Sequence, residues 1–386
     1  MADSETEKLP HELVVDILSR LPAPYLWPLR CVSKTWFRLI ARNPQFAKSI
    51  YDRSLQFKSN PSFIIAWGEK KSCTSEEEKE KLDFYMATDH TECDKAIKLD
   101  LPFISDEKDP SCYPVYSICN GMLCLSDDDK REVYVWNPLT NDHIAVPFPV
   151  TPLRDPDNHQ SAVFGFCFLE SVNEYKIIRL VTECKWAELE YHTDVSVYTL
   201  GKDSSWRIVK KDVPFYLSFE GMPCPQINEK VMWLAKRDGE WPVRTLLVFD
   251  LKDESLQEIC RPPIDDRSDL TSIQDLGGSL CLFNAHKSKD VEMWMMKLDG
   301  GKYILSAPVT LGRPEVVGEF SKLIPLGVVA CSGDILVLKN SMGLITYNSS
   351  TKSIIHLKEF GVPILRAHAF SGSIISPRAI NGKTGV

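Results

Sequence analysis

The side chains that could do chemistry are few and far apart in this chain of 386 residues. The run His90-Thr91-Glu92-Cys93 offers two metal ligands, but no second pair has matching spacing. Gly382-Lys383-Thr384 resembles the end of a phosphate loop, yet Pro377 stands where that loop needs its first glycine. Asp127-Asp128-Asp129 lacks the ordered oxygen spacing of a calcium site. We therefore expect no catalytic residue, no metal and no cofactor, and a protein that is not an enzyme.

Composition narrows the class of protein further. Residues 1–50 hold seven Lys and Arg against five Asp and Glu, whereas the whole chain has a net charge of −8. A slightly basic segment on an acidic body argues against nucleic acid as the main ligand. The twelve cysteines include no C-x-x-C pair, which favours buried free thiols in a reducing compartment. With no run of 18 apolar residues and no secretory signal, we expect no membrane contact and a place in the cytoplasm, the nucleus or both.

Residues 9–46 are dense in apolar side chains at helical spacing, although they are too few to enclose a core of their own. Pro10 can begin a helix, because the N–H that proline lacks has no partner at that position. Leu21-Pro22 ends this helix, and a second pattern begins near Leu29 and ends at Asn43-Pro44. The side chains expected on the first helical face are Leu13, Ile17, Leu18 and Leu21, and those expected on the second are Val32, Trp36, Leu39 and Ile40.

A row of basic residues accompanies the second apolar face. Arg30, Lys34, Arg38 and Arg42 are spaced four residues apart on the expected helix, with no acidic residue beside them. Such a face suits docking onto an acidic helical partner. The periodicity alone also allows a helical subdomain whose apolar stripe packs on the rest of this chain.

The order of residues in this segment resembles the F-box. It runs through Leu9-Pro10, Glu12-Leu13, Ile17-Leu18, Arg20-Leu21-Pro22, Arg30-Cys31-Val32-Ser33-Lys34, Trp36, Leu39-Ile40, Pro44 and Phe46. F-box proteins bind the Skp-type adaptor of cullin–RING ubiquitin ligases, so the resemblance implies that adaptor as a partner and, through it, the cullin and RING subunits. It also implies the adaptor-facing side chains, which are Leu9, Pro10, Leu13, Ile17, Leu18, Leu21, Pro22, Leu26, Leu29, Val32, Trp36, Leu39 and Ile40.

The segment between the two helices departs from the family pattern. The family usually carries a basic residue and a serine and then a further basic residue there, where this chain has Ala23-Pro24-Tyr25-Leu26-Trp27-Pro28. Pro28 lacks the N–H that would bond to the carbonyl oxygen of Pro24, four residues earlier. We therefore expect the middle helix to be shortened or broken, which leaves weakened adaptor binding as an alternative.

The body of the chain changes to short strand-like segments separated by turn residues. Trp136, Tyr198, Phe249, Met296 and Tyr347 occupy equivalent places in a weak repeat of about 50 residues, which is typical of propeller blades. We expect an α+β chain in which a small helical module precedes an all-β, propeller-like domain of about six blades. The first strand (63–67) and the last (367–375) would share a closing blade. The alternative is an array of β-sandwiches.

A second resemblance covers most of residues 110–375. The units 118–125 and 135–140, with 163–167 and 174–177, resemble the F-box-associated domain of plant F-box proteins. The expected organisation is an F-box module at 1–50, a linker at 51–61, a propeller-like recognition domain at 62–376 and a flexible tail at 377–386.

Together the two resemblances imply the substrate-recognition subunit of a Skp–cullin–F-box ubiquitin ligase, which holds an unidentified target protein and makes no bonds itself. One alternative is an F-box decoy or scaffold. Another is a propeller enzyme or sugar-binding protein with a helical appendage. Most tryptophans of the body suit the blade cores, but Trp186 and Trp241 stand beside charged loop residues and could anchor the target.

Overall fold

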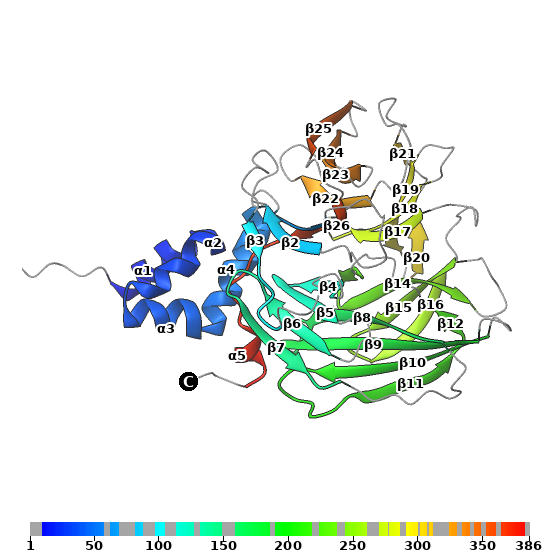
Figure 1. The fold of residues 1–386 in the computed structure, drawn as a ribbon, viewed down its shortest axis with the longest axis horizontal. Coiled ribbons are helices and arrows are strands. Elements are labelled where there is room, and N and C mark those ends of the chain that lie inside the picture. Colours follow the sequence, from blue (N-terminus) through cyan, green and yellow to red (C-terminus); the bar gives the residue numbers. More distant parts are fainter. Residues whose placement is uncertain are drawn as a thin grey trace, which may run out of the picture.

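Helices form the N-terminal part of the described chain, and antiparallel sheets form most of the rest (Figure 1). The computed structural model describes residues 10–57, 62–68, 82–87, 97–104, 113–126, 132–148, 159–185, 190–217, 224–237, 244–260, 270–276, 278–285, 291–299, 302–306, 309–311, 324–329, 334–339, 343–348, 353–359 and 364–382. Within this part of the chain no helix is long and apolar enough to cross a membrane.

The N-terminal module consists of α1 (His11–Ser19), α2 (Ala23–Leu26), the 3₁₀ turn η1 (Trp27–Cys31), α3 (Lys34–Arg42) and α4 (Pro44–Phe57). The predicted break in the middle helix is confirmed, because α2 has only four residues and η1 follows it directly. Pro28 lies in the first turn of η1, where its missing N–H does least harm.

α3 begins later than expected. Ser33 has an extended backbone, and its hydroxyl accepts a hydrogen bond from the backbone N–H of Trp36 at 3.2 Å, which is a helix N-cap. The expectation of one helix from about Leu29 onward was therefore wrong, and Arg30 lies on η1 rather than on α3.

Two predicted boundaries fall inside elements of the structure. Residues 51–57, which we expected in a linker, continue α4, because Ile50 is buried and Tyr51 is half-buried against the rest of the protein. Residues 377–380, which we expected in a tail, form the short helix α5 (Pro377–Ile380), whose start is capped by the hydroxyl of Ser376.

Six antiparallel sheets follow within the described residues. The strands of the first three are β1 (Ser62–Gly68), β2 (Leu82–Ala87) and β3 (Ile97–Leu99) with β26 (Ile364–Phe370); β4 (Val115–Cys119), β5 (Met122–Ser126), β6 (Val133–Asn137) and β7 (Asp142–Val146); and β8 (His159–Leu169), β9 (Glu174–Lys185), β10 (Glu190–Thr199) and β11 (Arg207–Val213).

The strands of the other three sheets are β12 (Phe215–Tyr216), β13 (Gln226–Ile227), β14 (Lys230–Arg237), β15 (Arg244–Asp250) and β16 (Ser255–Cys260); β17 (Leu270–Asp275), β18 (Leu280–Ala285), β19 (Val291–Asp299), β20 (Lys302–Leu305) and β21 (Val309–Leu311); and β22 (Ile324–Val329), β23 (Asp334–Lys339), β24 (Gly343–Asn348) and β25 (Ser353–Glu359). Each sheet is built from consecutive strands except the first. The arrangement is propeller-like, as predicted.

The first and last strands of the domain pair with each other as predicted, although β26 ends at Phe370 and residues 371–375, expected in the last strand, lie beyond it. β1 and β26 are antiparallel neighbours, with Ser62 opposite Phe370. The repeat also has a structural counterpart, since its five aromatic or methionine residues lie in corresponding strands of five sheets. Those strands are β6, β10, β15, β19 and β24.

The chain beyond β26, residues 371–382, is here called the C-terminal strap. It lies across the sheet β4–β7, where Ser376 Oγ donates to Asp142 Oδ2 at 2.7 Å. The β4–β5 hairpin turns at Asn120-Gly121, both with positive φ. A Cβ on Gly121 would stand 2.6 Å from Ser373 Oγ, so only glycine lets the strap approach this closely.

Candidate docking module

α1 divides its apolar residues between an inward and an outward side. Leu18 is 2% exposed and packs in the protein's own core, and Leu21 is half-buried. Leu13 and Ile17 are 49% and 51% exposed. The four residues expected on one face therefore differ in exposure: Ile17 and Leu18 are about 100° apart around the helix axis, and Leu21 lies beyond the end of α1.

The rest of the predicted adaptor-facing set divides in the same way. Leu26, Leu39 and Ile40 are buried; Leu29 and Trp36 are half-buried; Pro10, Pro22 and Val32 are exposed; Leu9 lies outside the described residues. The buried members close the core of the module itself. The exposed ones are the members that a partner could touch without unfolding it.

Sequence reasoning missed two exposed aromatic residues. Tyr25 is 72% exposed on α2, and Phe37 is 41% exposed on α3. Tyr25 lies four positions after Leu21, and Phe37 directly follows Trp36. Both are large apolar side chains next to residues of the expected apolar faces, and that position was the sequence signal for them. We call Leu13, Ile17, Tyr25, Val32 and Phe37 the exposed apolar set.

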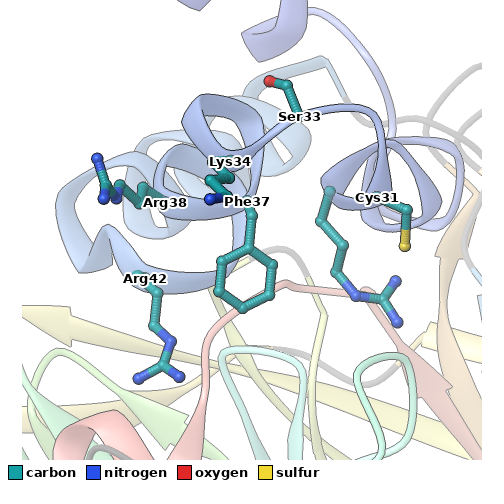
Figure 2. A pocket seen from close by; sticks show the side chains of 7 residues that line it. Cys31, Ser33, Lys34, Phe37, Arg38 and Arg42 are labelled. Carbon is teal, nitrogen blue, oxygen red and sulfur yellow. The ribbon is translucent and has the colours of Figure 1, made fainter. Parts of the chain in front are cut away.

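Basic side chains surround Phe37 in a shallow pocket of about 530 Å³ (Figure 2). We call this pocket the basic groove; its lining residues are Arg30, Cys31, Ser33, Lys34, Phe37, Arg38 and Arg42. The guanidinium of Arg30 lies 4.2 Å from the centre of the Trp27 ring, and its Nη1 donates to the Trp27 carbonyl oxygen at 2.8 Å. The Arg42 guanidinium lies 5.7 Å from the centre of the Phe37 ring. The four predicted basic residues therefore line one pocket, although Arg30 lies on η1 and the other three lie on α3.

α4 joins the module to the propeller-like domain through buried contacts. Phe46, Ala47 and Ile50 belong to the same hydrophobic cluster as Phe168 of β8 and Ile374 of the strap. The ammonium of Lys48 lies 5.4 Å from the centre of the Phe168 ring. A cavity of about 460 Å³ remains between α4, the turns after β8 and β10, and the strap.

Several cysteines of the propeller-like domain belong to its packed core. Cys119, Cys124, Cys167 and Cys281 are buried and form no disulfide, in line with the predicted free thiols. Burial raises the pKa of the Cys224 thiol to about 12, so the thiolate is not the form present near neutral pH. Trp186 and Trp241, the predicted target anchors, lie outside the described residues.

Fold and surface together define a class: a small helical docking module fixed to a propeller-like domain. Comparison with known families makes the class specific. A model described as F-box-like matches residues 6–53, and one described as F-box associated beta propeller domain matches residues 79–303. The chain belongs to the family of F-box proteins with an F-box associated beta propeller domain.

Curated relatives agree with this family. F-box protein At3g07870 of Arabidopsis thaliana is 24% identical over an alignment of 395 positions, which covers 92% of this chain and 89% of that protein. F-box/kelch-repeat protein At3g23880 of the same plant is 23% identical over 353 residues, covering 89% of this chain and 88% of that protein. Among solved structures, an oligogalacturonate lyase in complex with manganese aligns over 72% of this chain and 71% of its own, with 9% identity and a TM-score of 0.41, too low to support a functional argument.

Proposed function

We propose that this protein is the substrate-recognition subunit of a Skp–cullin–F-box ubiquitin ligase. Its helical module would bind the Skp-type adaptor, and through it the cullin and RING subunits. Its propeller-like domain would hold the target. The protein would then act by proximity, because a held target presents its lysines to the conjugating enzyme at a high effective concentration.

The observation that carries the proposal is the exposure of Leu13 and Ile17 on α1. The module already has its own closed core, in which Leu18, Leu26 and Ile40 are nearly inaccessible to solvent. Two large aliphatic side chains one helical turn apart, left outside that core, are a typical anchor for a partner helix. Membership of the F-box family supplies the identity of the partner.

The test is binding of the full chain to a purified Skp-type adaptor, with Leu13→Asp/Ile17→Asp as the variant. Both residues are about half exposed, so the variant is expected to fold. Its affinity for the adaptor should fall at least a hundredfold, because two charges would replace the apolar anchors. The matched control is Ile208→Asp/Ile304→Asp, since these isoleucines are 54% and 50% exposed on β11 and β20. Loss of binding in both variants, or in neither, would contradict the proposal.

A second candidate function is a decoy or scaffold with weakened adaptor binding. The short α2 and the 3₁₀ turn at Pro28 favour it, because this is the part of the module that departs from the family pattern. A wild-type chain that fails to bind the adaptor, together with a Pro28→Arg variant that binds it, would establish this candidate over the first.

A further inference from the structure

The basic groove gathers positive charge on one side of the module. Arg30, Lys34, Arg38 and Arg42 are four of the seven residues that line it, and none of the seven is acidic. Within the described residues, no carboxylate pairs with Lys34 or Arg38, both of which are exposed. By contrast, Lys48 on α4 is paired with Asp52 at 3.3 Å.

This arrangement costs the isolated module stability. Lys34 is the first residue of α3, where the helix dipole favours an acid and disfavours a cation, and the first turn holds no acid. Lys34, Arg38 and Arg42 are also spaced by four, so each repels the next across one helical turn. A role in holding the module together therefore does not explain Lys34 and Arg38.

We infer that the basic groove receives an acidic segment of the adaptor, and this inference rests on the adaptor-binding function proposed above. Successive cations on α3 are separated by about 6 Å along the helix axis. Carboxylates one helical turn apart on a partner helix match that spacing. Phe37, 41% exposed among the cations, supplies an apolar contact in the middle of the groove and links it to the exposed apolar set (Figure 2).

The expected division of labour is that apolar residues hold the complex and the groove guides its formation. Charges at the rim of an interface mainly raise the association rate and lower it again when salt screens them. Charge reversal in the groove should therefore slow association strongly at low salt and weakly at high salt. Reversal should not lower the melting temperature, because it turns the repulsion between positions 38 and 42 into an attraction and places an acid at the start of α3.

The experiment measures binding of the full chain to the adaptor at about 50 mM and about 500 mM NaCl. The variant is Lys34→Glu/Arg38→Glu. The matched control is Lys211→Glu/Lys252→Glu, which makes the same change of net charge at two exposed lysines of the propeller-like domain. Support is a loss of at least tenfold in the association rate for the groove variant at low salt, a loss of less than threefold at high salt, a melting temperature no lower than that of the wild type, and little effect of the control.

Three results would overturn the inference. Equal binding of the groove variant and the wild type, while Leu13→Asp/Ile17→Asp abolishes binding, would leave adaptor docking intact and assign the groove no part in it. Unchanged adaptor binding with lost binding of poly-L-glutamate would show that the groove serves another acidic protein. A wild-type chain that does not bind the adaptor at either salt concentration would remove the proposed function and this inference together.

Discussion

The side-chain amide of Asn137 donates a hydrogen bond to the backbone carbonyl oxygen of Ser373 at 2.9 Å, across 236 positions of sequence. A second hydrogen bond from the same nitrogen reaches the carbonyl oxygen of Ile375 at 2.8 Å. Its oxygen accepts from the backbone N–H of Leu139 in the turn after β6. One buried amide therefore fixes both a hairpin of the propeller-like domain and the C-terminal strap.

Replacing Asn137 by Ala should lower the free energy of unfolding by roughly 3 kcal/mol, because it leaves two buried carbonyl oxygens without a donor. Chemical denaturation measures the loss. Gln45→Ala removes an exposed amide from α4 and is the control, for which we expect a change within about 0.5 kcal/mol. Equal stabilities of the two variants would show that the strap is held by other contacts.

Leu26 and Tyr25 are neighbours on α2 with opposite surroundings, 0% and 72% exposed. Leu26→Ala should cost about 3 kcal/mol of stability, because it opens a cavity in the core of the module. Tyr25→Ala should leave stability within about 0.5 kcal/mol and weaken adaptor binding instead. Denaturation curves together with adaptor titrations separate the two effects. A destabilising Tyr25→Ala would mean that this ring belongs to the protein's own core.

Glu254 links two sheets through ion pairs. Its carboxylate accepts from both Nη atoms of Arg207 of β11, at 2.9 and 3.0 Å, and from Lys176 Nζ of β9 at 2.8 Å. The hydrogen bonds from Arg207, more than the one from Lys176, lower the pKa of Glu254 to about 2. A carboxyl with a lowered pKa stabilises the folded protein above its ordinary pKa and loses that contribution as the pH falls towards the lowered one.

Glu254→Gln should therefore lower the free energy of unfolding by roughly 2 kcal/mol at neutral pH. The difference from the wild type should shrink as the pH falls from about 5 to about 2. Denaturation at several pH values measures this difference. Asp253→Asn changes the exposed neighbouring carboxylate and is the matched control. A difference for Glu254→Gln that grows on acidification would refute the assignment of sign.

Pro28 is exposed, and the turn that contains it is also held by the hydrogen bond from Arg30 to the carbonyl oxygen of Trp27. Pro28→Ala should change the affinity for the adaptor by less than about threefold, because Leu26 beneath the turn is already fully buried. Calorimetric titration measures the affinity. Pro24→Ala, within α2, is the matched control. A gain of tenfold or more in Pro28→Ala alone would show that the break limits docking.

The sequence predicted helices followed by strands, the shortened middle helix, the repeat and the pairing of the first strand with the last, but neither α4 nor α5. The shortened helix and the strand pattern follow from local chemistry, namely proline without an N–H and strands separated by turn residues, and the closing pair follows from the repeat. Periodicity could not say which side of α1 faces the protein, since Leu18 and Ile17 are equally apolar. That choice depends on α4, whose packing on β8 and the strap involves residues more than a hundred positions away. Ser33 is a residue type typical of helix N-caps, but the apolar pattern extends back to Leu29 and predicted an earlier start for α3.

The joint between α4 and the propeller-like domain gives the molecule a fixed reach. Phe46, Ala47 and Ile50 are buried in one cluster with β8 and the strap, so the helical module cannot swivel without opening that cluster. A target gripped by the propeller would stand at a set radius and angle from whatever holds α1. The shape and mobility of the target would then decide which of its lysines come within reach, because the joint itself would not bend.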